Sequence, residues 1–170
     1  MSFSVFGAGA WGFALADLLA KAGHKTTLWG RNVERVEQLA ASRSLSDRMV
    51  GCSLSDDVVV TSSLVSASDS DVFVFAIPTP AIRDFVADFD ARNNSATWIN
   101  AAKGIEQKSL ITGGEVFCEF ATGGTEVYTL SGPSHAEELA RMIPTSIVLA
   151  GRDKMIGSRG VCGCLPSLRS

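Results

Sequence analysis

Six residues near the N-terminus have the composition and spacing of an anion-binding turn. Gly7-Ala8-Gly9-Ala10-Trp11-Gly12 fits the pattern G-x-G-x-x-G and lies between an apolar run and a stretch with helical periodicity. In this pattern Gly7 permits the tight turn, Gly9 lets the backbone approach a pyrophosphate, and Gly12 lets helix and strand pack closely. Free N–H groups at the helix start hold the anion. We therefore expect a bound dinucleotide at this turn, Ala10 included. The alternative to a dinucleotide site is that the glycines only form a tight strand-to-helix turn. Trp11 could equally pack in the core instead of contacting a ligand.

The residues after the second apolar run bear on which dinucleotide fits. Trp29-Gly30-Arg31-Asn32 stand where an acidic residue would bind the ribose 2′-hydroxyl of NAD, or an arginine the 2′-phosphate of NADP. No acidic residue is present, and Arg31 can make charge-assisted hydrogen bonds to phosphate. The sequence thus favours NADP, with tolerance of NAD. A solvated surface arginine is the alternative interpretation of Arg31.

Three further segments follow predicted strands and carry polar or backbone groups suited to a ligand. They are Ile77-Pro78-Thr79-Pro80, Ala102-Lys103-Gly104-Ile105-Glu106 and Ser131-Gly132-Pro133-Ser134. Because open α/β sheets bind ligands at the carboxyl ends of their strands, we expect the segments to ring one crevice, with Pro78 at the cofactor. Lys103 could bring its ammonium to a substrate phosphate or a polarised carbonyl, and an ordinary surface lysine is the alternative. The serine segment offers an anion site or, alternatively, a helix N-cap by Ser134.

Other kinds of catalytic or metal chemistry have weaker support. His135 invites a general-base role, but Glu137 and Glu138 lie on the same predicted helix, so a structural role is favoured. Cys162 and Cys164 have no second Cys/His pair at ligand spacing, and we expect no metal site. No G-x-S-x-G pattern supports a serine nucleophile.

The elements that position these residues alternate between strand and helix patterns. Apolar runs predict strands at 3–6, 24–29, 58–61, 71–76, 97–100, 127–130 and 146–150, and helical periodicity predicts helices at 10–22, 33–41, 81–89, 113–120 and 135–141. This alternation predicts an α/β fold of Rossmann type, a doubly wound, mostly parallel sheet with helices on both faces. We assign residues 1–150 to one NAD(P)-binding domain and residues 151–170, which lack periodicity, to an irregular tail.

Composition limits the classes of partner. The 170 residues are 46% hydrophobic and 19% charged, with a net charge of −3, so the chain can bury a core but has no basic patch for nucleic acid. Glycines and Asp17 interrupt the apolar N-terminal stretch, and we expect neither a signal peptide nor membrane insertion. The lack of a basic block favours small-molecule chemistry. Four scattered cysteines fit a reducing cytoplasm.

These motifs, in their order and spacing, resemble one enzyme family. The chain is similar to the bacterial-type NAD(P)-dependent glycerol-3-phosphate dehydrogenases over about residues 2 to 150. The segments that carry the similarity are the glycine turn, Leu28-Trp29-Gly30-Arg31, Ala76-Ile77-Pro78-Thr79-Pro80, Lys103-Gly104-Ile105-Glu106, and Leu130 to Glu138 through Pro144-Thr145. The resemblance implies hydride transfer between NAD(P)H and dihydroxyacetone phosphate, giving glycerol 3-phosphate for phospholipid synthesis. By position it implies that Trp11, Arg31, Asn32 and Ala136 contact the cofactor, Gly132 and Ser134 the substrate, and Lys103 both.

The resemblance also implies a second, helical domain with a catalytic lysine, which we do not find in this sequence. Residues 151–170 do not resemble the family at that point, and we expect a truncated or frame-shifted product with impaired turnover. Full-length members could form homodimers. Two other functions stay open: a non-catalytic dinucleotide-binding module, and a different NADP-dependent reductase such as a ketopantoate reductase.

Overall fold

The computed structural model of the chain describes residues 1–45, 49–89, 96–132 and 135–151. Pro133 and Ser134 of the predicted anion segment lie outside these residues, as does the predicted tail beyond Gly151 with Cys162 and Cys164. Within the described residues, no helix has both the length and the apolar character needed to cross a membrane.

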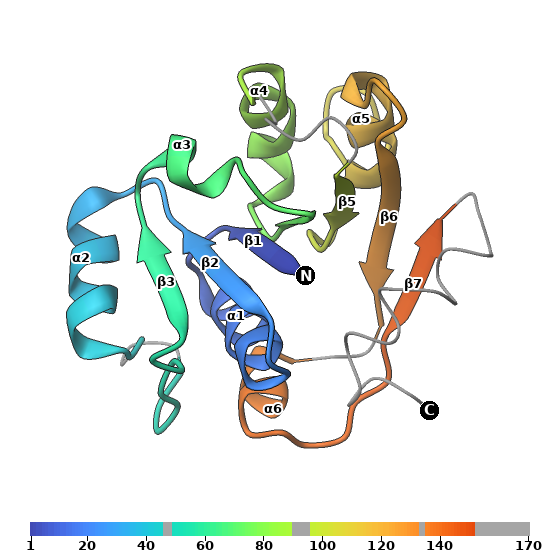
Figure 1. The fold of residues 1–170 in the computed structure, drawn as a ribbon. Coiled ribbons are helices and arrows are strands. Elements are labelled where there is room, and N and C mark those ends of the chain that lie inside the picture. The colour runs from blue at the N-terminus through green and yellow to red at the C-terminus, as the bar shows by residue number, and fades with distance from the viewer. Residues whose placement is uncertain (46–48, 90–95, 133–134, 152–170) are drawn as a thin grey trace.

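A seven-stranded sheet runs through the centre of the molecule in the order β3-β2-β1-β4-β5-β6-β7 (Figure 1). In chain order the strands span Ser2–Phe6, Lys25–Trp29, Val58–Thr61, Val72–Phe75, Thr97–Asn100, Glu126–Ser131 and Val148–Gly151. The first six pair in parallel, and β7 runs antiparallel to β6 at the edge. The strand order reverses between β1 and β4, which is the arrangement of a doubly wound Rossmann sheet.

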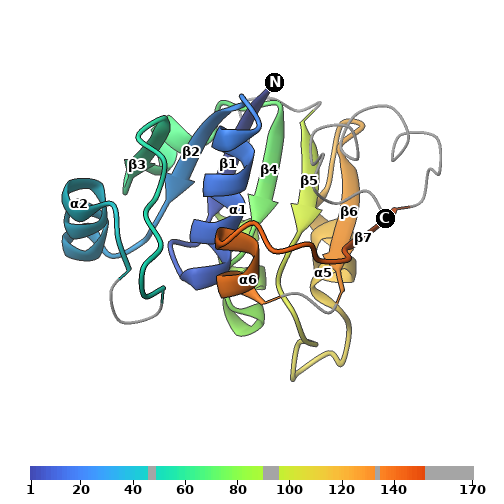
Figure 2. The ribbon, with the colours of Figure 1, turned by 90° about the horizontal axis from the view of Figure 1, so that it is seen from below.

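Helices cover both faces of this sheet. Figures 1 and 2 show α1 (Ala10–Lys21) and α6 (Ala136–Ala140) on one face and α4 (Ile82–Ala87) and α5 (Gly113–Phe120) on the other. α2 (Val33–Ser42) lies beside β3 at one end of the sheet. The predicted fold class is therefore confirmed.

The predicted elements differ from the observed ones mainly at their ends. The helix predicted at 81–89 begins instead as a 3-10 turn, η1 (Thr79–Ala81), and continues as α4. The strand predicted at 146–150 starts two residues later and includes Gly151, so the predicted tail boundary falls inside β7. The short helix α3 (Leu64–Ala67) was not predicted, because four residues are too few to show helical periodicity.

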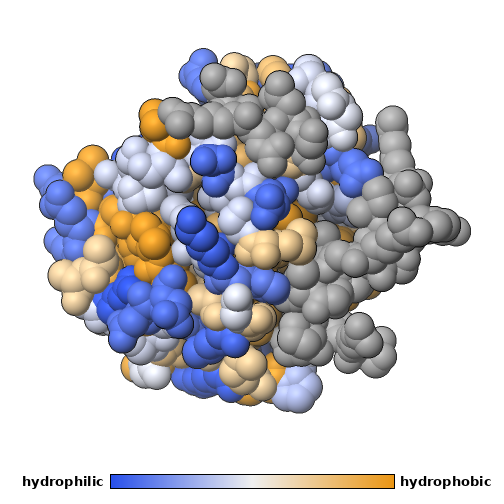
Figure 3. Space-filling view, in the orientation of Figure 1, coloured by the Kyte–Doolittle hydropathy of each residue, from blue (hydrophilic) through white to orange (hydrophobic). Residues whose placement is uncertain are grey.

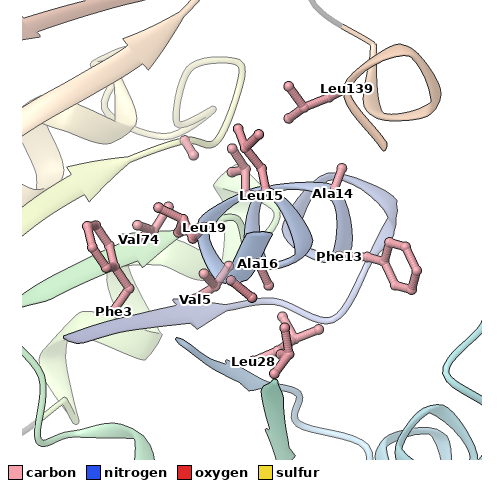
Figure 4. Close-up of a cluster of buried hydrophobic side chains, with 14 of the residues drawn as sticks. Phe3, Val5, Phe13, Ala14, Leu15, Ala16, Leu19, Leu28, Val74 and Leu139 are labelled. Carbon is pink, nitrogen blue, oxygen red and sulfur yellow. The ribbon is translucent and has the colours of Figure 1, made fainter. Parts of the chain in front are cut away.

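Two hydrophobic clusters hold the layers together. β4 contributes Val72 and Val74 to the first and Phe73 and Phe75 to the second, because successive side chains of a strand point to opposite faces. Figure 4 shows the first cluster, which is mainly aliphatic and in which α1 packs on the sheet and α6 packs against α1 through Leu139. The second cluster is mainly aromatic. Burial on both faces explains the continuous apolar run of this central strand.

The surface is mixed in character. On the side seen in Figure 3, hydrophobic and hydrophilic side chains are interspersed. Exposed large apolar side chains occur singly on several elements, for example Val33 on α2, Val59 on β3 and Val65 on α3. Scattered exposure of this kind is usual for a folded domain.

Candidate functional site

The carboxyl ends of the central strands lie together at one edge of the sheet. The parallel register places Phe6 opposite both Trp29 and Phe75. Just beyond the strands, the Gly7 N–H donates to the Trp29 carbonyl at 2.9 Å and the Ala101 N–H to the Phe75 carbonyl at 2.9 Å. The glycine turn and the Lys103 segment therefore start from the same edge, where open α/β sheets bind ligands.

The three glycines of the turn have three different surroundings. Gly7 has φ +117°, and a Cβ there would lie 2.6 Å from the Ala76 carbonyl oxygen. A Cβ on Gly12, which is buried in α1, would overlap the Gly7 carbonyl oxygen. A Cβ on Gly9 would meet no atom within 4 Å. Gly7 and Gly12 are thus required by the backbone itself, whereas Gly9 faces open space.

The space beside Gly9 has the chemistry of an anion site. Gly9 precedes α1, and within the described chain no side chain caps this helix end. The first intrahelical bond runs from the Phe13 N–H to the Gly9 carbonyl at 2.9 Å, so the N–H groups of the first turn remain available. Together with the helix dipole, these groups suit a pyrophosphate, and the missing Cβ leaves room for it.

A cavity of about 930 Å³ opens beside the turn. Its size lies within the range of small-molecule sites, about 300–1,000 Å³. Five residues predicted to bind the cofactor line it: Gly7, Gly9, Arg31, Asn32 and Pro78. Apolar side chains that include Trp29, Leu64, Ile77 and Phe85 form another part of the wall. The cavity thus combines an anion-binding rim with an apolar surface suited to a flat base.

Arginine side chains line one wall of this cavity. Arg31 and Arg35 both belong to the lining and are exposed to solvent. Asn32 lies between them as the N-cap of α2, and its Oδ1 accepts a hydrogen bond from the Arg35 N–H at 2.8 Å. Because the Asn32 oxygen is used in capping, its amide N–H groups and the two guanidinium groups are the donors for an anionic ligand.

Lys103 lies near this cavity but outside its lining. Its side chain is exposed, and Nζ donates to the Gly132 carbonyl at 3.4 Å. The same Nζ is 5.5 Å from the centre of the Trp11 ring. The Thr79 hydroxyl donates to the Lys103 carbonyl at 2.9 Å, and the adjacent Gly104 has φ +120°. The Lys103 segment thus contacts each of the other two predicted crevice segments.

The other predicted site residues have less direct access to the cavity. Ala10 begins α1 and Ala136 begins α6, and both are half-buried against the first hydrophobic cluster. Gly132 has φ +146°, and a Cβ there would lie 2.6 Å from the Ser146 carbonyl oxygen. His135 is exposed at the N-cap of α6. Among the described residues, no group of three or more His, Cys, Asp or Glu side chains is placed to hold a metal ion.

Comparison with known proteins identifies the family. The sequence profile described as NAD-dependent glycerol-3-phosphate dehydrogenase N-terminus matches residues 2–156. The chain belongs to this family. The glycerol-3-phosphate dehydrogenase [NAD(P)+] of Carboxydothermus hydrogenoformans is 40% identical over 151 residues, covering 87% of this chain and 45% of the relative. The corresponding protein of Fusobacterium nucleatum is 36% identical over 157 residues, covering 91% of this chain and 47% of the relative.

A solved structure supports the fold of this glycerol-3-phosphate dehydrogenase family member. The crystal structure of glycerol-3-phosphate dehydrogenase from Coxiella burnetii superimposes with a TM-score of 0.81 at 23% identity, covering 99% of this chain and 51% of that one. The chain therefore spans about half the length of the relatives it matches.

Sequence reasoning missed two features of this family member's site. Arg35 lines the cavity together with Arg31, and the sequence did not single it out as a candidate site residue. No local pattern pointed to Arg35, because Arg31 precedes the helix in which Arg35 lies. The ion pair between Arg83 and Glu106, described below, joins residues far apart in sequence, and no local pattern predicts it.

Proposed function

We propose that this chain binds NADP or NAD at the edge of the sheet, as the cofactor-binding part of a glycerol-3-phosphate dehydrogenase. The observation that carries the proposal is the open space at Gly9, where the uncapped start of α1 meets the cavity. We assign the whole of residues 1–150 to this NAD(P)-binding domain.

Each cofactor contact has a separate physical basis. The first turn of α1 binds the pyrophosphate through backbone N–H groups. Arg31 binds the 2′-phosphate of NADP with charge-assisted hydrogen bonds, which favours NADP over NAD. Asn32 and Pro78 contribute from the cavity wall, and Ala10, Trp11 and Ala136 from the adjoining helices. Lys103 contacts the cofactor as well as the substrate.

The substrate binds beside the nicotinamide end of the cofactor. When bound, the nicotinamide exchanges a hydride with dihydroxyacetone phosphate or glycerol 3-phosphate. The Lys103 ammonium attracts the substrate phosphate or polarises the carbonyl oxygen, and Gly132 and Ser134 complete the contact. The contact between the Lys103 ammonium and the Gly132 carbonyl at 3.4 Å supports this role.

Substrate turnover by this chain alone is expected to be slow. The relatives are about twice as long as the matched part, and we propose that residues from their other half complete the substrate site. General acid–base help contributes about a hundredfold to ten-thousandfold in rate, and positioning adds to that. For the complete enzyme we propose a cytoplasmic location, a role in supplying glycerol 3-phosphate for phospholipids, and a homodimer.

The test is a titration of the purified chain with NADPH and with NADH, followed by nicotinamide fluorescence. Dihydroxyacetone phosphate is then added and NADPH oxidation is recorded at the absorbance maximum of the reduced nicotinamide. We expect saturable binding, tighter for NADPH, and little oxidation. A Gly9→Ala variant is the matched control, because its methyl group fills the space assigned to the pyrophosphate.

The possible results separate the alternatives. Absence of binding to a folded chain would refute the proposed function. Binding that dihydroxyacetone phosphate does not alter would favour a non-catalytic dinucleotide-binding module. NADPH oxidation in the presence of a 2-keto acid such as ketopantoate, but not in the presence of dihydroxyacetone phosphate, would assign the chain to another reductase class. Rapid oxidation of NADPH on addition of dihydroxyacetone phosphate, which is reduced to glycerol 3-phosphate, would show that the chain already contains the proton donor.

A further inference from the structure

The loop that carries Lys103 is attached to the preceding helical segment at two points. Residues 101–112 connect β5 to α5. The Thr79 hydroxyl donates to the Lys103 carbonyl at 2.9 Å. Three residues further on, the Arg83 guanidinium binds the Glu106 carboxylate through two hydrogen bonds, Nε to Oε1 at 2.8 Å and Nη2 to Oε2 at 2.9 Å. Both attachments come from η1 and α4.

Glu106 also organises the loop internally. Its N–H donates to the Ile111 carbonyl at 2.8 Å, and its carbonyl accepts from the Leu110 N–H at 2.9 Å. The Ser109 hydroxyl donates to its carboxylate, and an isolated bridge joins Ile105 to Thr112. The backbone and the side chain of Glu106 therefore all form hydrogen bonds within the loop. A change in the position of its carboxylate would shift the rest of the loop.

The ion pair lies at the surface and is partly exposed. The Glu106 side chain is 12% exposed and that of Arg83 34%. Arg83 also contacts Glu119 at 2.6 Å and lies 5.9 Å from the centre of the Phe120 ring. The hydrogen bonds from Arg83, followed by the one from Ser109, lower the pKa of Glu106 to about 2, and those to Glu106 and Glu119 raise the pKa of Arg83. Both groups therefore stay charged throughout the neutral range.

We propose that Arg83, acting through Glu106, is a positioning residue for Lys103. The bidentate pair holds the loop so that the ammonium stays between the Trp11 ring and the Gly132 carbonyl. α4, which carries Arg83, also supplies Asp84 and Phe85 to the cavity wall. The same helix thus forms part of the cavity wall and binds the Lys103 loop. The inference rests on the proposed function only where it assigns ligand contacts to Lys103.

A role in stability alone accounts less well for this arrangement. Arg83 is 34% exposed, and an ion pair that solvent reaches usually contributes only about 1 kcal/mol or less to folding stability. Here a second attachment, from Thr79, holds the carbonyl of Lys103 itself. Gly104, between the two attachments, has φ +120°, a conformation that fixes the direction of the chain where the lysine leaves the sheet. Both attachments to η1 and α4 therefore lie within three residues of Lys103.

A double-mutant cycle on NADPH affinity tests the proposal. We expect Arg83→Gln to weaken NADPH binding by about tenfold, within the usual range for coupled contacts. In a Lys103→Ala background the same change should have almost no further effect, because there is no ammonium left to position. Equal losses in both backgrounds would overturn the proposal, since a purely structural role does not depend on Lys103.

Three further variants make the cycle specific. Glu106→Gln should reproduce the loss seen with Arg83→Gln and should not add to it. Glu119→Gln removes the other partner of Arg83 without touching the loop, and it should leave NADPH affinity unchanged. Arg83→Lys keeps the charge but not the bidentate geometry and should restore affinity only in part. Urea unfolding of every variant identifies any that fail to fold.

A second measurement is independent of cofactor binding. Trinitrobenzenesulfonate reacts with neutral lysine amines, and peptide mass spectrometry gives the rate at each site. We expect Arg83→Gln and Glu106→Gln to increase labelling of Lys103 several-fold relative to Lys25, whereas Glu119→Gln should not. If the wild-type chain does not bind NADPH, the proposed function fails while this labelling still decides the positioning role. Unchanged labelling of Lys103 would overturn it.

Discussion

The indole N–H of Trp11 donates a hydrogen bond to the backbone carbonyl of Ala101 at 3.0 Å, although 90 positions separate these residues in the sequence. This bond joins the glycine turn after β1 to the loop after β5. The same indole ring lies 5.5 Å from the ammonium of Lys103. The parts proposed to bind the pyrophosphate and the substrate are therefore connected through one side chain.

Replacing Trp11 with phenylalanine should uncouple these two parts. Trp11→Phe removes the N–H donor but keeps an aromatic ring against the core. We expect a loss of about 1 kcal/mol in the free energy of unfolding, the usual net contribution of one hydrogen bond. NADPH affinity should also fall several-fold, because the Lys103 loop is no longer fixed to the turn. Urea unfolding and NADPH fluorescence titration measure the two effects.

Trp98→Phe is the matched control for this change. Trp98 is buried in the second cluster, and within the described chain its indole N–H has no hydrogen-bond partner. This substitution should lower stability through lost packing and leave NADPH affinity as it is. A Trp11→Phe variant that binds NADPH like the wild type would contradict the proposed link.

The glycine turn allows binding and folding to be separated. Gly9→Ala adds a methyl group that meets no protein atom within 4 Å. Its stability should stay within about 1 kcal/mol of the wild type, the size of a typical N-cap change. Cofactor binding should be largely lost, because the methyl group occupies the position of the pyrophosphate. Thermal unfolding and NADPH titration on the same samples provide the comparison.

Gly12→Ala should have the opposite profile. Its added Cβ overlaps the Gly7 carbonyl oxygen inside the fold. Overpacking of this kind costs about 1–3 kcal/mol and sometimes more, so a lowered midpoint of unfolding is expected. The site assignment would be wrong if Gly9→Ala bound NADPH normally, whatever the behaviour of Gly12→Ala.

Cofactor preference should respond to the charge at Asn32. Asn32→Asp keeps a side-chain oxygen for the Arg35 N–H and so preserves the cap of α2. The new carboxylate repels a 2′-phosphate but can bind the 2′-hydroxyl of NADH. We expect the ratio of NADPH to NADH affinity to fall by about tenfold or more, equivalent to ~1.4 kcal/mol. Fluorescence titrations with both dinucleotides measure the ratio.

Asn32→Ser is the control for this prediction, because serine also caps a helix but adds no charge. It should leave the affinity ratio close to that of the wild type. An equal change in both variants would mean that the loss of the amide, rather than the added charge, determines the preference.

The sheet was predictable because its signals are local. β4 reads as a continuous apolar run, and the glycine turn, the cap at Asn32 and the Thr112 capping box before α5 all have short sequence patterns. The direction of β7 was not predictable, because antiparallel pairing with β6 depends on the path of the connection rather than on the strand's own residues. The four-residue helix α3 is too short to have a period.

The sequence suggests individual candidate residues for the site, but not how these residues contact one another. The sequence identified Lys103, Gly132 and Trp11, whose types suit phosphate binding or close packing. It did not indicate that the Lys103 ammonium contacts both of the others, since these contacts cross the sheet edge. The pairing of Arg83 with Glu106 was missed for the same physical reason. Long-range contacts follow from the fold and not from sequence spacing.

Acid should weaken the fold partly through Glu106. The hydrogen bonds from Arg83 and Ser109 lower its pKa from 4.5 to about 2. The unfolded chain therefore binds a proton to this carboxyl more readily than the folded chain does. The stabilisation is complete above about pH 4.5 and is lost as the pH falls toward 2. Glu106→Gln should be less stable than the wild type at pH 7, and the difference should shrink across this interval.

Urea unfolding of both proteins at a series of pH values between 7 and 2 measures this difference. Comparing the two curves isolates Glu106, because Asp71 and Glu115 also have lowered pKa values and contribute equally to both proteins. Ser109→Ala removes one of the hydrogen bonds to the carboxylate, so it should move the loss of stability to higher pH. A constant difference between the wild type and Glu106→Gln from pH 7 to pH 2 would show that the charged pair with Arg83 contributes nothing to the fold.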